Sequence, residues 1–165
     1  MVEPLPEKDF DFLLEEQVAS FDVTKIPDDG PVGYILEVDL EYPDKLHDSH
    51  SDYPLAPEAT VIQPDDVSPY TRALADKLSI KPTSCRKLVA NLKKKERYAV
   101  HYRTLKLYID LGMKITKIHR IISFTQSTWL KQYIDFNTTQ RQLATSKFER
   151  DFFKLMNNAV FGKTM

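Results

Sequence analysis

Three cations, an amide and an aromatic ring are expected on one face of a helix near the end of the chain. Side chains three and four positions apart stack on one side of a helix, and the positions concerned are Lys147, Arg150, Lys154, Asn158 and Phe161. Stacked cations repel one another, so the helix gains no stability from them. A polyphosphate along this face would reverse the effect by accepting charge-assisted hydrogen bonds. A solvated polar face is the alternative, and spacing alone favours it.

The same helix carries an apolar stripe. Phe148, Phe152, Leu155 and Ala159 repeat at intervals of four, three and four, which aligns them about a third of a turn from the cations. We therefore expect the stripe to face a core and to aim the cationic face outward.

The residues from Lys154 to Gly162 read Lys-Leu-Met-Asn-Asn-Ala-Val-Phe-Gly and resemble the KxxxNSxYG motif of family B DNA polymerases. Ala159 stands in place of the Ser of this motif, and Phe161 in place of its Tyr. Two earlier blocks, 33–58 and 111–135, resemble the protein-primed polymerases of Maverick or Polinton transposons. The three blocks occur in the same order as in those enzymes, and together they extend over nearly the whole chain.

The resemblance implies an α+β fragment of a polymerase palm and fingers, whose partners are a deoxynucleoside triphosphate and a DNA primer-template. Lys154 would contact the triphosphate as the catalytic residue, helped by Arg150 and by Lys147 or Arg141. Asn158, Phe161 and Gly162 would shape the pocket for the incoming nucleoside. Phe161 lacks the phenol of the motif, so the role of that hydroxyl does not carry over. A terminal, priming protein is a further partner that the family implies.

The family also implies nucleotidyl transfer by two Mg²⁺ ions held by Asp carboxylates. The resemblance places the first of these Asp residues upstream of residue 1 and the second, in an Asp-Thr-Asp element, downstream of Met165. We therefore expect the isolated fragment to be inactive and to hold no metal. A non-catalytic, nucleic-acid-binding remnant of a transposon polymerase is the alternative function.

A single aspartate and one loop could also bind a metal ion. Asp39 precedes Tyr42-Pro43 and superficially resembles the first catalytic motif, but the family has more residues between Asp and Tyr. Asp39 is thus a minor candidate for a metal ligand, and a structural or surface role is preferred. A second candidate is a loop with two histidines and two aspartates, which solvation explains better: His47, Asp48, His50 and Asp52.

Cations that interleave with aromatic residues could contact DNA, because phosphate contacts need only surface charge while rings can stack on bases. Lys147, Arg120 and Lys131 are the candidates we select. Most of the aromatic residues nearby are expected to fill the core instead.

Charge divides the chain into two halves. Residues 1–80 hold 19 acidic and 5 basic residues, a balance of −14, and residues 81–165 have a balance of +13. The basic half could bind a polyanion, or the two halves could neutralise one another across an internal interface. Charge alone does not separate these possibilities. By resemblance and composition, we divide the chain into an acidic, loop-rich region, 1–66, like the insertion of protein-primed polymerases, and a basic palm and fingers segment, 67–165.

Periodicity and turn residues predict the elements that must position these side chains. Alternation predicts a strand at 34–42 with one apolar and one largely acidic face, and five prolines predict an extended loop at 43–70. Further strands are predicted at 98–102 and 113–124. Helices are predicted at 10–18, 69–78, 85–95, 105–111 closed by Gly112, 129–136 capped by Ser127 or Thr128, and 139–160 before Gly162.

Composition favours a soluble, intracellular protein, nuclear or cytoplasmic, with no membrane partner. No run of apolar residues is long enough for a membrane span. Cys85 is the single cysteine, so no internal disulfide is possible, and a plain thiol in a reducing compartment is the preferred interpretation.

Overall fold

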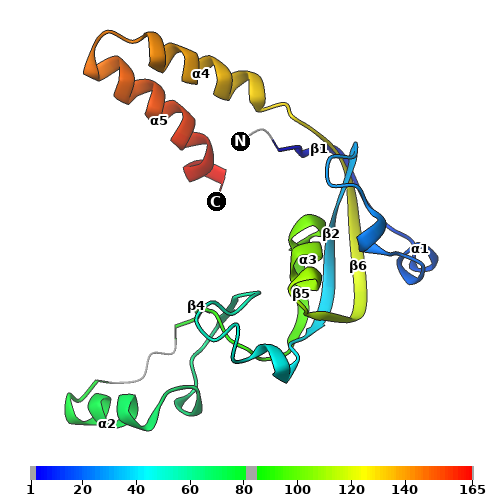
Figure 1. Ribbon diagram of the computed structural model, residues 1–165, viewed down its shortest axis with the longest axis vertical. Coiled ribbons are helices and arrows are strands. Elements are labelled where there is room, and N and C mark those ends of the chain that lie inside the picture. Colours follow the sequence, from blue (N-terminus) through cyan, green and yellow to red (C-terminus); the bar gives the residue numbers. More distant parts are fainter. Residues whose placement is uncertain (1–2, 81–84, 165) are drawn as a thin grey trace.

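The computed structural model describes residues 3–80 and 85–164 and shows a mixed α+β fold. Its centre is a curled, four-stranded antiparallel sheet with the strand order β1-β6-β2-β5 (Figure 1). The strands are β1 (Leu5–Phe12), β2 (Val32–Glu41), β5 (Lys95–His101) and β6 (Lys114–Ser127). Two of these strands come from the acidic half of the chain and two from the basic half, so the sheet joins both. The domain boundary at residue 66 stays a prediction.

Strand β2 has the two faces that its alternating sequence predicts. Leu36, Val38 and Leu40 are fully buried, and helix α3 (Tyr102–Asp110) adds Tyr102 and Leu105 to the same core. Burial of aliphatic and aromatic side chains is the main favourable contribution to such a fold. The acidic residues of β2 lie on its other face. The predicted strands at 98–102 and 113–124 are confirmed as parts of β5 and β6, although Tyr102 already begins α3.

Helix α3 ends where the sequence predicts. Gly112 follows it with φ of 101°, a left-handed conformation that glycine adopts without steric cost. This turn reverses the chain directly into β6, which pairs with both β1 and β2.

The predicted helix at 10–18 is largely wrong. Residues up to Phe12 form the edge strand β1, and only α1 (Glu15–Ala19) is helical. Pairing with β6 decides the conformation of β1, because Phe10 and Phe12 are more than half exposed and contribute little burial of their own. A 3-10 turn, η1 (Val23–Lys25), leads from α1 toward β2.

The segment between β2 and β5 is mostly irregular, as its prolines predict. It contains the short turns η2 (Asp44–Leu46) and η3 (Pro64–Asp66) and a small ribbon of β3 (Glu58–Thr60) with β4 (Lys87–Val89). The predicted helix at 69–78 is confirmed as α2 (Pro69–Lys77), whose start is capped by Ser68. The predicted helix at 85–95 is wrong, since this stretch forms β4 and enters β5.

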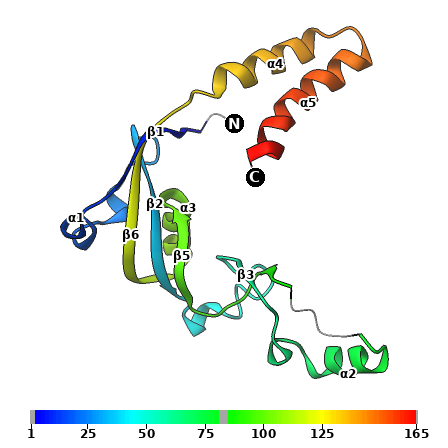
Figure 2. The same cartoon turned by 180° about the vertical axis from the view of Figure 1, so that it is seen from behind.

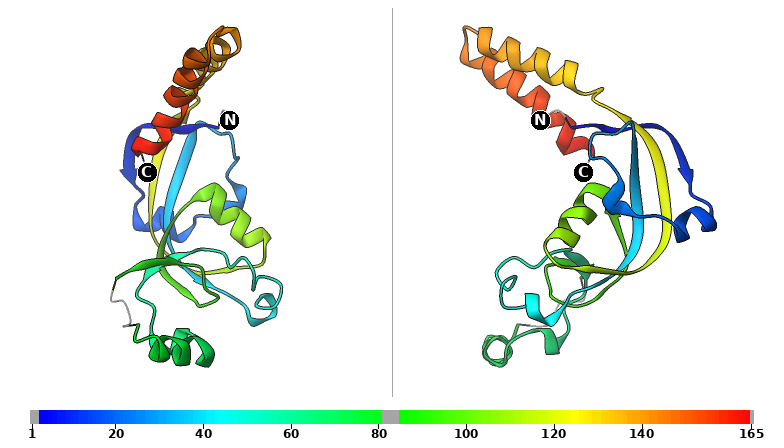
Figure 3. Two further views of the ribbon diagram at one scale, coloured as in Figure 1. Left: turned by 90° about the vertical axis from the view of Figure 1, so that its left-hand side faces the viewer. Right: turned by 45° about the vertical axis from the view of Figure 1, so that its right-hand side comes forward.

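Two antiparallel helices, α4 (Lys131–Leu143) and α5 (Lys147–Thr164), form a hairpin after β6. The hairpin leaves the sheet at the end of β6 and projects away from it (Figures 2 and 3). The predicted boundaries at 129–136 and 139–160 are wrong, because one helix ends at Leu143 and the next begins at Lys147. The predicted cap is wrong too: Ser127 belongs to β6, and no side chain caps α4. Among the described residues, no helix is long and apolar enough to cross a membrane.

Candidate functional site

A capping box fixes the start of α5. The Ser146 hydroxyl accepts the backbone N–H of Glu149 at 3.1 Å, and Glu149 Oε2 accepts the backbone N–H groups of Thr145 and Ser146 at 3.2 Å each. The hydrogen bonds that the carboxylate accepts, first of all the one from the Ser146 backbone, lower the pKa of Glu149. The spacing Ser-x-x-Glu before an apolar run is a known signal for a helix start, whereas we predicted a single helix through these residues.

One side of α5 packs against α4. Phe153, Met156, Asn157 and Val160 are partly buried along this side and repeat at helical spacing. Between the helices, the Tyr133 hydroxyl donates to the Met156 carbonyl at 3.2 Å. This packing sets the rotation of α5 about its axis, and so decides which side chains point outward.

The cationic side of α5 lies about a third of a turn from the packed side. Lys147, Arg150, Lys154 and Asn158 are all exposed there. Over the described parts of the chain, no acidic side chain forms an ion pair with any of the three cations; Arg150 Nε contacts only the Ser146 carbonyl, at 3.4 Å. The structure thus brings these four predicted site residues together on one helix face, where the three cations form no ion pair with any described residue.

The apolar stripe does not face a core, contrary to our prediction. Phe148 is 78% exposed, and Phe152, Leu155 and Ala159 are exposed as well. Helix α5 offers two apolar stripes at helical spacing, and α4 covers the other one. The prediction that the cationic face points outward holds nonetheless, because it lies about a third of a turn from either stripe.

The end of α5 differs from the prediction in its length. Gly162 does not end the helix, which continues to Thr164, and a methyl group added at this exposed glycine would contact nothing within 4 Å. The backbone of Phe161 continues the helical face of Lys154 and Asn158. The side chain of Phe161 lies outside the part of the structure that is described.

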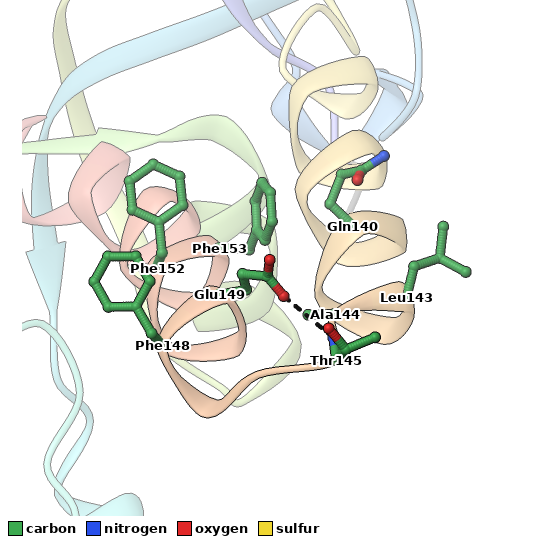
Figure 4. A pocket seen from close by; sticks show the side chains of 8 residues that line it. All are labelled: Gln140, Leu143, Ala144, Thr145, Phe148, Glu149, Phe152 and Phe153. Carbon is green, nitrogen blue, oxygen red and sulfur yellow. Dashed lines mark hydrogen bonds between the residues drawn. The ribbon is translucent and has the colours of Figure 1, made fainter.

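A hollow of about 340 Å³ lies near the turn between α4 and α5. Figure 4 shows the Phe148 and Phe152 rings side by side at its edge and the Glu149 carboxylate directed at Thr145. None of the candidate residues Lys147, Arg150, Lys154 and Asn158 lines it. The hollow is therefore a feature of the apolar side of the hairpin and not of the candidate site.

The other predicted DNA contacts are engaged in ion pairs. Arg120 Nε lies 2.6 Å from Glu37 Oε2, and Lys131 pairs with Asp135 one turn later. Of the three cations selected for DNA, only Lys147 is left without an acidic partner among the described residues. Charge pairing between the halves of the chain is common in the sheet and its neighbouring loops, where acids of residues 1–80 pair with Lys93, Lys95, Arg97, Arg103, Lys106 and Arg120.

Asp39 has structural partners in the sheet. Its Oδ1 accepts the backbone N–H of Arg97 at 2.8 Å and lies 2.8 Å from His119 Nε2. The Arg97 N–H and then His119 lower the pKa of Asp39. Mg²⁺ requires several oxygen ligands in near-octahedral order, whereas the neighbours of Asp39 are nitrogen donors. In the described residues no group of three or more His, Cys, Asp or Glu side chains is placed to hold a metal ion. These residues do not fit Mg²⁺.

The histidines of the acidic loop are held by Tyr42. His50 Nδ1 lies 2.7 Å from the Tyr42 hydroxyl, which also accepts the backbone N–H of Leu55 at 3.2 Å. His47 Nε2 lies 3.3 Å from the Tyr42 carbonyl. Tyr42 therefore connects both histidines and Leu55 within this loop.

The pairing of Glu37 predicts a loss of stability in acid. Hydrogen bonds from Arg120 and then Arg97 lower the pKa of Glu37 below its ordinary value of 4.5. The pKa of Glu37 is lower in the folded than in the unfolded chain. Its contribution to folding stability is therefore fully present above pH 4.5 and is lost as the pH falls through the folded pKa. Between pH 6 and pH 3, the free energy of unfolding measured with urea should decline less for Glu37→Gln than for the wild type. An equal decline in the free energy of unfolding of both proteins would exclude this contribution of Glu37.

Comparisons of the chain with protein-family models, with curated proteins and with solved structures found no match.

Proposed function

We propose that this chain is part of a protein-primed, family B DNA-directed DNA polymerase, in which it binds the incoming nucleotide and the primer-template. The observation that carries the proposal is the exposed face of α5, where Lys147, Arg150, Lys154 and Asn158 lie in line and the cations have no acidic partner among the described residues. The resemblance of residues 154–162 to the fingers motif gives this face its assignment.

The electrostatics of α5 support a phosphate ligand. Lys147 and Arg150 lie in the first turn, where the helix dipole already makes the potential positive. Cations at this end cost stability, and repulsion between them adds to that cost. A triphosphate along the face would remove both penalties by accepting hydrogen bonds from Arg150 and Lys154.

Each residue of the face has a role in this proposal. The Lys154 ammonium stabilises the charge that develops on the transferring phosphoryl group, and Arg150 binds the triphosphate with its guanidinium. Asn158 and Phe161 lie one and two turns further along and adjoin the nucleoside. Mg²⁺, which the described residues do not fit, would be held by carboxylates elsewhere in the polymerase.

Primer extension tests the enzymatic part of the proposal. The 165-residue chain should not extend a primed template with Mg²⁺ and the four deoxynucleoside triphosphates, whereas a longer polymerase that includes both flanking carboxylate motifs should extend it. Robust extension by the isolated chain that Asp39→Ala abolishes would contradict our assignment of Asp39. Inactivity of the longer protein would favour a non-catalytic, nucleic-acid-binding module.

Nucleic-acid affinity should depend strongly on α5. We expect the chain to bind DNA with little sequence preference and with an affinity that falls steeply with salt. Replacing Lys147, Arg150 and Lys154 by Gln should reduce the slope of log affinity against log salt by about 2 if all three contact single-stranded phosphates. Fluorescence anisotropy at several salt concentrations measures this slope. The matched control replaces Lys45, Lys77 and Lys87 by Gln, because these three lysines are exposed in other parts of the chain. Equal slopes for both triple variants would refute a role for α5.

A further inference from the structure

Two arginines flank one glutamate on the outer face of the sheet. Glu37 on β2 accepts hydrogen bonds from Arg97 Nη1 on β5 at 3.3 Å and from Arg120 Nε on β6 at 2.6 Å. The Glu37 side chain is only 15% exposed, whereas Arg97 is 66% and Arg120 is 64% exposed. The carboxylate therefore lies at the floor of this arrangement, and the two guanidiniums form its outer rim.

The backbone of Arg97 is strained into place. Arg97 has φ of 49°, in the left-handed region that side chains other than glycine rarely adopt. Its N–H donates to Asp39 Oδ1 at 2.8 Å, and the pairing of β2 with β5 shifts register between Val38 and Leu40. Such irregularities redirect a side chain, and they are found near functional sites more often than elsewhere. Here the irregularity keeps Arg97 beside Glu37.

Apolar side chains lie next to the two arginines. A hollow of about 160 Å³ between them is lined only by residues of the four strands, and its apolar part comprises Phe12, Ile35, Ala99 and Ile122. A second hollow, of about 420 Å³, shares Phe12 and Arg120 with the first and continues to His119 and α1. The Arg120 guanidinium lies 5.8 Å from the centre of the Phe12 ring. Two cationic groups and an exposed aromatic ring thus line the first hollow, a partly apolar depression on the outer face of the sheet.

We propose that this depression binds a single strand of nucleic acid, with a backbone phosphate on Arg97 and Arg120 and a base against Phe12 and its apolar neighbours. Each guanidinium has five N–H donors and gives one to Glu37, so the outward N–H groups can bind a phosphate in the two-point geometry that arginine favours. Among the residues that line the first hollow, two guanidiniums face the single carboxylate of Glu37, which leaves a positive excess there. A single strand fits better than a duplex, because only unpaired bases can reach Phe12 and the apolar side chains beside it.

This site is separate from the α5 face, and it does not depend on the polymerase assignment. The test therefore uses the full chain carrying Lys147→Gln, Arg150→Gln and Lys154→Gln, in which α5 cannot contribute cations. Anisotropy of a fluorescent oligothymidylate measures its remaining affinity. Adding Arg97→Gln and Arg120→Gln should weaken binding about tenfold or more and lower the salt slope by about 1.4, which corresponds to two phosphate contacts on a single strand.

Two comparisons separate binding from a purely structural role. Adding Lys77→Gln and Lys87→Gln instead removes the same charge from exposed positions outside the sheet and should change affinity less than about threefold. Arg97→Lys with Arg120→Lys keeps the pairing with Glu37 but loses the two-point geometry, so a folded protein with intermediate affinity is expected. Equal effects of the two Gln pairs, undiminished binding by the Lys pair, or a preference for duplex over oligothymidylate would each overturn the proposal.

Discussion

In the intact polymerase that we propose, replacing Lys154 by Ala should lower catalytic efficiency by about a hundredfold or more while leaving the melting temperature nearly unchanged. Loss of one preorganised group that stabilises developing charge has an effect of this size. Stability should be spared, because Lys154 is exposed, belongs to neither apolar stripe of α5 and has no acidic partner among the described residues. Single-nucleotide incorporation kinetics and thermal melting of the same preparations measure the two quantities.

Two other variants show whether the effect depends on position and shape. Lys154→Arg keeps the charge but changes its geometry, so it should recover only part of the activity. Lys147→Ala removes another exposed cation two turns earlier, and it should lower catalytic efficiency less than Lys154→Ala does. The assignment of α5 as the nucleotide-binding helix fails if Lys154→Ala polymerises normally or loses activity only through unfolding.

A second large effect is expected at Lys95, which fastens the β3–β4 ribbon to the sheet. Lys95 is fully buried, and its ammonium donates to Glu58 Oε2 at 2.9 Å, to Asn91 Oδ1 at 2.6 Å and to the Asn91 carbonyl at 3.1 Å. All three of its N–H donors are thereby used. Lys95→Met removes the charge and leaves the Glu58 carboxylate and the Asn91 oxygens without this partner.

We expect Lys95→Met to lower the free energy of unfolding by about 3 kcal/mol. We take the lower end of the range for breaking a buried ion pair, because the Glu58 side chain is 30% exposed. Urea denaturation of the chain measures the loss. The double variant Lys95→Met/Glu58→Gln should regain a large part of it, since no unpaired charge then remains. Lys93→Met, which breaks an exposed pair with Asp66, should cost less than about 1 kcal/mol. Equal losses for Lys93→Met and Lys95→Met would contradict this account.

The sequence predicts best those elements whose local pattern agrees with their packing. The alternation around Leu36, Val38 and Leu40 predicts β2, and Ser68-Pro69 and Gly112 mark helix ends that the structure confirms. Strand β1 has no such pattern, because its conformation depends on pairing with β6, more than a hundred residues later. The turn between α4 and α5 was predictable in principle, since Ser146 and Glu149 form a capping box.

The candidate site was predicted in part for a similar reason. Helical spacing is enough to align Lys147, Arg150, Lys154 and Asn158, whichever side of α5 is packed. Spacing cannot choose between the stripe of Phe148, Phe152 and Leu155 and the stripe that α4 covers, because both repeat at intervals of three and four. Ion pairing is likewise invisible in the sequence: Arg120 and Lys154 look equivalent there, yet only Arg120 meets a carboxylate that is distant in the chain.

Lysine footprinting of the intact protein that we propose to be a polymerase tests most directly whether α5 binds a deoxynucleoside triphosphate. Brief acetylation with acetic anhydride, followed by peptide mass spectrometry, reports the reactivity of each exposed lysine with and without a deoxynucleoside triphosphate on a primed template. A bound triphosphate should protect Lys154 severalfold, because its ammonium then donates hydrogen bonds to phosphate oxygens. Lys77 and Lys87, exposed on α2 and β4, serve as internal controls and should react at unchanged rates. If Lys154 stays as reactive with the nucleotide as without it, α5 is not the nucleotide-binding helix.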